Sequence, residues 1–181
     1  MIQLKAPFDV EQIKSLRAGD AVKITGVIYT GRDAAHKRLC ELLEKNEKLP
    51  IDVKNMAMYY VGPTPAKPGR AIGSAGPTSS YRMDPYSEPL LKEGLKVMIG
   101  KGPRDKSIKD MLVKYGAVYM SAIGGAAASI SETVKKCDVV TYEDLGAEAI
   151  HRLEVEDFYA IVTYDSVGND LFEQGINTYK K

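Results

Sequence analysis

Residues 21–48 have the sequence AVKITGVIYTGRDAAHKRLCELLEKNEK, in which a strand pattern passes directly into a helix pattern. Alternate side chains of a strand point to opposite faces, so apolar residues at every second position indicate a strand with one buried face. The apolar face of residues 21–30 carries Val22, Ile24 and Ile28. A strand over residues 21–30 is therefore expected.

A helix is expected over residues 34–48, directly after that strand. Its apolar positions recur at helical spacing and form one stripe, made of Ala35, Leu39, Leu42 and Leu43. Asp33 precedes the first turn and is a favourable N-cap residue. A strand that leads through Thr30-Gly31-Arg32 into a helix is typical of α/β proteins.

The rest of the chain alternates strand-like and helix-like segments in the same way. Further strands are expected at residues 56–61, 70–74, 96–99, 117–122, 138–142, 149–155 and 159–164. Further helices are expected at residues 85–93, 105–114, 126–136 and 166–174. Residues 155–158, VEDF, predict a turn between two strands, so the sheet should be mixed. The prediction is a single layered α/β domain spanning residues 1–181.

Composition excludes several classes of protein. The chain is 44% hydrophobic and 27% charged, which suits a packed core rather than disorder. A net charge of +1 lacks the basic excess of a nucleic-acid binder. The chain starts without a secretory-signal pattern, and its longest uncharged run, residues 115–131, is too short and too rich in Gly and Ala to span a membrane. We therefore expect a soluble, cytoplasmic protein.

Metal-ligating side chains are scarce. The two cysteines, Cys40 and Cys137, are far apart, and the two histidines are His36 and His151. No CxxC pattern or zinc-ligand spacing occurs, so no metal or cluster site is expected within this chain.

Polar, glycine-rich segments recur where expected strands give way to helices. They are residues 30–33 (TGRD), 76–85 (GPTSSYRMDP), 100–105 (GKGPRD) and 124–125 (GG). Ligands of α/β sheets bind at such junctions, and helix N-termini favour anions. Arg32, Arg82 and Lys101 add positive charge there, so the segments predict a receptor for carboxylate or phosphate. Asp84 and Pro85 are expected at the N-cap and first position of the second of these helices.

Each segment also has a structural interpretation. Gly31-Arg32-Asp33 is compatible with a turn, a solvated arginine and a cap, and residues 76–80 with a loop whose hydroxyls bond to the local backbone. His36 suits either an anion contact or an exposed or locally bonded position one turn into the helix. None of the segments matches a dinucleotide fingerprint or a P-loop.

The junctions, taken together and in order, carry a family resemblance. The segments are YTGRDAAH (residues 29–36), YVGPTP (60–65), IGSAGPTSSYRMD (72–84), MIGKG (98–102) and GGAA (124–127). They resemble the C-terminal domain, or β subunit, of class I fumarases and L-tartrate dehydratases, over nearly the whole chain. The family typically has glycine where this chain has Tyr81, a difference that affects loop flexibility and pocket shape.

This resemblance implies a swivelling β/β/α fold and an active site shared between two halves. The other half would be a separate α subunit whose three cysteines bind a [4Fe-4S] cluster with one iron open to a dicarboxylate substrate. A hetero-oligomer is therefore expected. The implied reaction is reversible fumarate hydration to malate, in which iron acts on the C2 hydroxyl and carboxylate as a Lewis acid.

The resemblance also implies roles for individual residues. Arg32, Arg82 and Lys101 would clamp the substrate carboxylates and stabilise the charge that develops after loss of the C3 proton. Thr78 occupies the position of the proposed proton-abstracting hydroxyl, and it would need help from nearby cations or a helix N-terminus. The further candidates are His36, Ser79 and Ser80.

Other functions stay open on the sequence alone. Tartrate, mesaconate or another hydroxy diacid would suit the same clamps. A regulatory module that binds an anionic metabolite, or a purely structural subunit, would carry the same loops without contributing to turnover.

Overall fold

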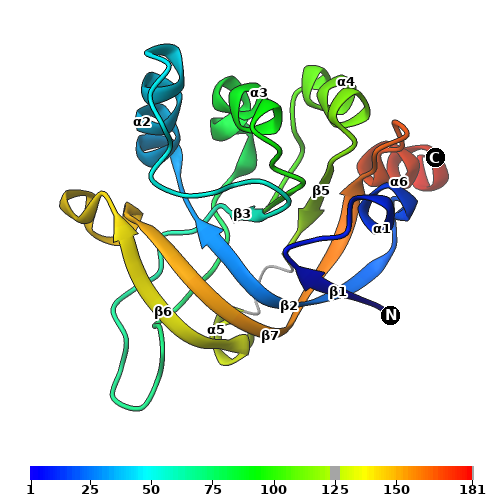
Figure 1. Cartoon of the computed structure of the whole chain (residues 1–181). Helices are drawn as coiled ribbons and strands as arrows, with labels where there is room; N and C mark the ends of the chain where they lie inside the picture. Colours follow the sequence, from blue (N-terminus) through cyan, green and yellow to red (C-terminus); the bar gives the residue numbers. More distant parts are fainter. Residues whose placement is uncertain (123–126, 181) are drawn as a thin grey trace.

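The computed structural model describes residues 1–122 and 127–180. Strands and helices alternate through most of this range, with three helices side by side above a strongly curved sheet (Figure 1). The expected α/β fold with a single mixed sheet is confirmed.

Seven strands form the sheet in the order β1-β2-β3-β4-β5-β7-β6. Their bounds are Ile2–Ala6 (β1), Ala21–Thr30 (β2), Ala57–Tyr59 (β3), Val97–Gly100 (β4), Val118–Ser121 (β5), Val134–Thr141 (β6) and Ile150–Tyr164 (β7). Strands β1 to β5 pair in parallel, whereas β7 runs antiparallel to β2, β5 and β6. The pairing of β7 with β2 closes β2, β3, β4, β5 and β7 into a barrel-like ring.

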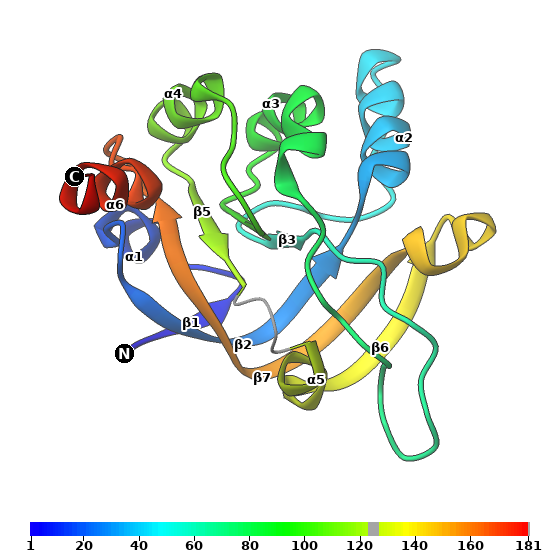
Figure 2. The same cartoon turned by 180° about the vertical axis from the view of Figure 1, so that it is seen from behind.

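Helices cover the ring from outside and at its ends. Their bounds are Val10–Ser15 (α1), Asp33–Glu44 (α2), Asp84–Lys92 (α3), Lys106–Tyr115 (α4), Ala127–Thr133 (α5) and Leu171–Tyr179 (α6). Short 3₁₀ helices occupy Ser80–Met83 (η1) and Glu143–Glu148 (η2). Helix α3 packs between α2 and α4, as both views show (Figure 2). In the part of the chain described, no helix is long and apolar enough to cross a membrane.

Neighbouring residues of the short central strands point into two different hydrophobic cores. In β3, Tyr59 lies in the core inside the ring, while Met58 lies in the core beneath α2, α3 and α4. Ile99 and Met98 of β4 divide in the same way. All four side chains are fully buried, as expected for parallel strands covered on both faces.

The predicted turn at residues 155–158 is wrong. Strand β7 runs without interruption from Ile150 to Tyr164, and Asp157 in its middle has a positive φ of 55°. The register with β2 shifts opposite this position, between Ile24 and Gly26, which marks a β-bulge. The bulge bends β7 so that both of its halves pair with β2, and the polar residues mark the bend rather than a chain reversal.

Other expected elements differ at their ends or are absent. Residues 70–74, predicted as a strand, belong to a loop in which the Ser74 N–H donates to Thr64 Oγ1 over 2.7 Å. Helix α2 ends at Glu44. The predicted Ala35 and Leu39 are buried in it together with His36 and Cys40, whereas Leu42 and Leu43 are only half-buried. Predicted helix 126–136 stops at residue 133, where β6 takes over, and α6 starts at residue 171 instead of 166.

Candidate functional site

The candidate site lies at the edge of the sheet where β2, β3 and β4 end. These strands are parallel, so the loops that follow them meet at one edge. The loops lead into α2, into η1 and α3, and into α4. Three of the polar segments predicted from the sequence are thereby brought together. The fourth, Gly124-Gly125, lies outside the described residues.

Asp33 holds two of the expected clamping residues close to each other. Its Oδ2 accepts a hydrogen bond from Arg82 over 2.9 Å, and its Oδ1 lies 4.0 Å from Arg32 Nε. Arg32 Nε also lies 3.1 Å from Glu148 of η2. The Arg32 side chain is 25% exposed and that of Arg82 43% exposed. Two guanidinium groups are thus oriented by carboxylates while still open to solvent, and hence to a ligand.

Asp33 is not the N-cap that the sequence predicts. It forms the first residue of α2, Arg32 takes the cap position, and no side chain caps that end of the helix. The Asp33 carboxylate is instead turned toward the two arginines. The helix N-terminus keeps its free N–H groups and partial positive charge, which suits an anionic ligand.

A short parallel bridge joins the other expected residues. Ser79 pairs with Lys101, and the Ser80 N–H donates to the Lys101 carbonyl over 3.0 Å. In return, the Lys101 N–H donates to Ser80 Oγ over 3.0 Å. The Thr78 N–H donates to the carbonyl of Tyr60, the residue after β3, over 2.8 Å, and this bond fixes the backbone of the half-buried threonine. Ser80 is fully buried and serves the loop contact, while Thr78 and Ser79 remain partly exposed.

Two glycines allow the loops to approach this closely. A Cβ atom at Gly100 would overlap Ser80 Oγ, so a larger residue would push residues 79–80 away from Lys101. A Cβ at Gly62 would lie 3.3 Å from Arg32 Cδ and 3.2 Å from the Ala147 carbonyl. Gly62 therefore makes room for both the arginine and η2.

His36 lies beneath the site and not on its surface. Its side chain is 1% exposed, and Nδ1 lies 2.8 Å from the Arg32 carbonyl. Because a carbonyl only accepts, Nδ1 carries the proton and donates it. Nε2 has no hydrogen-bond partner among the described residues. The histidine fixes the backbone of Arg32, and the exposed position considered from the sequence is wrong.

Burial lowers the pKa of His36 to about 4; the Arg32 carbonyl opposes this shift, Arg104 adds to it and Asp33 opposes it. Since unfolding restores a pKa near 6.5, the unfolded chain binds the extra proton first. Stability contributed by a neutral His36 is therefore complete above pH 6.5 and is lost as pH falls toward 4.

Protonation of His36 should lower the free energy of unfolding by about 3 kcal/mol as the pH falls from 7 to 4. Urea unfolding at several pH values, for the native chain and for His36→Gln, measures this contribution. Gln does not titrate, so its free energy of unfolding should decline less steeply in that range. Equal slopes for the two proteins would contradict the assignment.

Two charged residues of this region were not singled out by the sequence. Arg104 lies in the predicted GKGPRD segment, where the sequence pattern indicates no particular contact for it. In the structure its side chain is fully buried. Glu148, which pairs with Arg32, comes from η2, a segment distant in sequence from every loop motif. The expected N-cap role of Asp84 is also wrong, because its carboxylate accepts from Arg104 Nε and from the Asp105 N–H.

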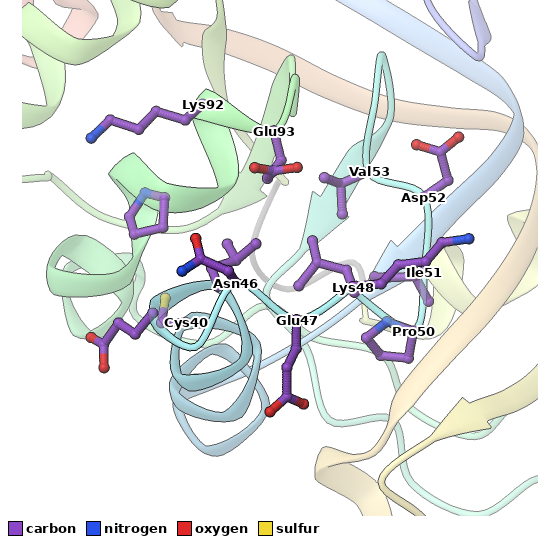
Figure 3. A pocket seen from close by; sticks show the side chains of 14 residues that line it. Cys40, Asn46, Glu47, Lys48, Pro50, Ile51, Asp52, Val53, Lys92 and Glu93 are labelled. Carbon is purple, nitrogen blue, oxygen red and sulfur yellow. The ribbon is translucent and has the colours of Figure 1, made fainter.

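A groove of about 840 Å³ opens away from the candidate site, at the C-terminal ends of α2 and α3. It is lined by the last turns of α2 and α3 and by residues 46–53, and Cys40 lies at its wall (Figure 3). Burial, with Glu44 and Glu41 nearby, raises the pKa of the Cys40 thiol to about 11. This cysteine is protonated at neutral pH and is not an activated nucleophile.

The part of the chain that the structure describes contains no cluster of three or more His, Cys, Asp or Glu side chains able to hold a metal ion. Cys40 lies on α2 and Cys137 on β6, and neither is in a disulfide. The donor set of these residues does not fit an iron–sulfur cluster, which needs several cysteine ligands in one place.

The fold and the loops define an α/β domain that presents cationic and hydroxyl side chains at the carboxyl ends of parallel strands. Residues 1–175 match the family described as Fumarase C-terminus, and the chain belongs to this family.

Relatives of two kinds are similar to the chain. A putative fumarate hydratase class I of Geobacillus stearothermophilus is 39% identical over 127 residues, which cover 68% of this chain and 24% of the relative. A putative L(+)-tartrate dehydratase subunit beta of Methanocaldococcus jannaschii is 39% identical over 115 residues, covering 62% and 59%. The aerobic class I fumarate hydratase of Escherichia coli K12 is 39% identical over 113 residues, covering 62% and 21%. The chain thus matches about a quarter or less of the fumarate hydratases and just over half of the tartrate dehydratase subunit.

Proposed function

We propose that this chain is the β subunit of a hydro-lyase that hydrates fumarate reversibly to malate. The observation that carries the proposal is the pairing of Arg32 and Arg82 around Asp33, next to the Lys101 bridge. The similar fumarate hydratases and the tartrate dehydratase subunit act, by name, on four-carbon diacids. Cations grouped at one sheet edge suit a substrate with two carboxylates.

Arg32 and Arg82 are proposed to bind the substrate carboxylates and to activate the substrate for proton loss. A guanidinium can donate two parallel hydrogen bonds to a carboxylate, which fixes its orientation. In the dehydration direction, malate loses its C3 proton and negative charge spreads onto the adjacent carboxylate. Fixed cations stabilise that charge most strongly in the transition state. Arg32, Arg82 and Lys101 are proposed to supply this stabilisation.

Thr78 is proposed to remove the C3 proton. A threonine hydroxyl is a poor base at its normal acidity, so its environment must favour the deprotonated form. Thr78 precedes the bridge to Lys101 and the turn that carries Arg82, and both cations favour a negative oxygen nearby. Ser79 is the alternative hydroxyl in the same segment.

The iron–sulfur cluster implied by the family resemblance is proposed to belong to the partner α subunit. Cys40 and Cys137 lie on separate elements and offer no cluster site between them. The loop edge described above would then face the partner, and the complete site would form only in the hetero-oligomer.

Tartrate is the second candidate substrate. The named tartrate dehydratase subunit beta matches this chain over 59% of its length, a larger share than any of the fumarate hydratases described above. An anaerobic assay of this chain, alone and mixed with the cluster-bearing subunit, against fumarate, mesaconate and tartrate separates the candidates. Activity of the mixture with one diacid identifies the substrate. A formed complex that turns over no diacid would contradict the proposed function.

Tyr81 is expected to shape the preference for substrate. Tyr81 is 63% exposed on η1, directly before Arg82, where the family typically has glycine. Tyr81→Gly should change the ratio of kcat/KM between fumarate and a bulkier diacid such as mesaconate by about tenfold, because it removes a large side chain beside the carboxylate clamp. Val167→Gly is a control, since Val167 is also exposed (55%) but lies in the loop before α6. An unchanged ratio in Tyr81→Gly would exclude Tyr81 from the pocket.

A further inference from the structure

Arg104 is a buried cation in a closely fitted environment. Its side chain has no exposed surface, and Nε donates to Asp84 while a terminal nitrogen donates to Ser87 Oγ over 2.9 Å. The guanidinium carbon lies 5.3 Å from the ring centre of Tyr60 and 5.1 Å from that of Tyr119. A buried charge requires such pairing, and a planar guanidinium between two rings is held in one orientation.

The partners of Arg104 connect two of the three loops of the candidate site, the loop before η1 and α3 and the loop before α4. The second Asp84 oxygen accepts the Asp105 N–H over 2.9 Å, which ties the start of α3 to the loop before α4. The Tyr119 hydroxyl lies 2.9 Å from Ser80 Oγ and 2.8 Å from the Gly102 carbonyl. The same Tyr119 ring stacks on Arg104, so the position of the guanidinium sets the position of the hydroxyl that joins the loops.

The contacts of Arg104 also extend toward the third loop. Tyr60, directly after β3, packs against His36 with ring centres 5.3 Å apart, and His36 donates to the Arg32 carbonyl. The Tyr60 carbonyl accepts the N–H of Thr78. One buried side chain is thereby connected to the loops that carry the arginines, the threonine and the lysine.

We propose that Arg104 is a positioning residue that sets the spacing between residues 78–82 and Lys101, so that their side chains meet one ligand. The inference rests on the proposed function, because it assigns Arg104 a part in forming that site. Arg104 itself does not contact the ligand, since it is buried beneath the loops.

Two variants of the assembled complex test this proposal. Arg104→Lys keeps the charge but loses the planar fork, and Tyr119→Phe keeps the ring but loses the hydroxyl between Ser80 and Gly102. The matched control is Tyr115→Phe, which removes a hydroxyl that bonds to Glu88 over 2.9 Å, away from these loops. For each complex, kcat and KM are measured together with hydrogen exchange of peptides that cover residues 78–83 and 100–104.

We expect kcat per assembled complex to fall roughly ten- to a hundredfold in both test variants, because small misplacements of reacting groups are costly. KM should change less, since long cationic side chains can follow the ligand. Exchange should quicken in the two loop peptides and stay unchanged elsewhere, and Tyr115→Phe should behave as the native protein does.

Values of kcat within twofold of the native complex, with unchanged loop exchange, would overturn the proposal. If Arg104→Lys does not assemble, Tyr119→Phe decides the question. If the native complex turns over no diacid, the proposed function fails separately, and the exchange data still decide the positioning role. Faster exchange confined to the two loops supports it, and a uniform change or none overturns it.

Discussion

Arg82→Ala should lower kcat/KM of the assembled complex by about a hundredfold or more, because in the proposed clamp it removes a charge-assisted contact to the charge of the transition state. The Arg82 side chain is 43% exposed and pairs with Asp33 at the surface, so its loss should change the free energy of unfolding by less than about 1 kcal/mol. Arg32→Ala should lower kcat/KM in the same way. Steady-state kinetics and urea unfolding of the same preparations separate activity from stability.

Arg70→Ala is the matched control for both arginine variants. Arg70 is half-exposed and pairs with Glu132 at 3.8 Å, so the same kind of surface ion pair is lost away from the candidate site. Turnover by this control should stay near that of the native complex. Near-native activity of Arg82→Ala, in a complex shown to be assembled, would remove Arg82 from the clamp, and the same outcome would apply to Arg32.

Thr78→Ala should have the second large effect, lowering kcat by about a hundredfold or more while KM changes little. The reason is that a proton-transfer group acts in the transition state and contributes little to ground-state binding. The backbone of residue 78 is fixed by its bond to the Tyr60 carbonyl, so the substitution removes the hydroxyl without moving the loop. Thr78→Ser, which keeps the hydroxyl, should restore most of the rate.

The neighbouring hydroxyl provides the comparison for Thr78. Ser79→Ala should lower kcat by less than about tenfold if Thr78 is the base. A larger loss in Ser79→Ala than in Thr78→Ala would exchange the two assignments. An effect of Thr78→Ala on KM alone would leave Thr78 a binding role only.

Elements with a clear hydrophobic period were predictable from the sequence. The alternation of Val22, Ile24 and Ile28 predicted β2 with its observed bounds, Ala21–Thr30. The expected helix at 105–114 appears as α4, Lys106–Tyr115, with the Asp105 side chain accepting the Ser107 N–H at its start. In these segments local propensity and tertiary packing favour the same structure.

Long-range pairing decided the elements that the sequence did not predict. Val155-Glu156-Asp157-Phe158 has turn-like composition, but pairing with β2 extends one strand through it by means of a bulge. Ile2–Ala6 forms β1 because it adds to β2 in parallel, a partner that its own short pattern does not reveal. Residues 134–136 leave the expected helix because β7 supplies strand partners for them.

The meeting of the three loops at one sheet edge was predictable, whereas the contacts between the loops were not. Loops that follow parallel strands must meet at one edge, which brought residues 30–33, 76–85 and 100–105 together as expected. The roles of Asp33, Asp84 and Arg104 depend on contacts between those loops, and a side chain that caps a helix looks the same in sequence as one that pairs with an arginine. Such pairings require the three-dimensional structure.

The most direct test of the shared site is an anaerobic titration of this chain into a fixed amount of the cluster-loaded partner subunit, with hydratase activity as the readout. We expect almost no activity from the partner alone, and a rise to a plateau at a fixed ratio of the two chains. The Arg82→Ala chain should bind the partner at the same ratio and reach a plateau lower by about a hundredfold or more. Full activity of the partner without this chain, or an equal plateau for both forms of the chain, would contradict the account.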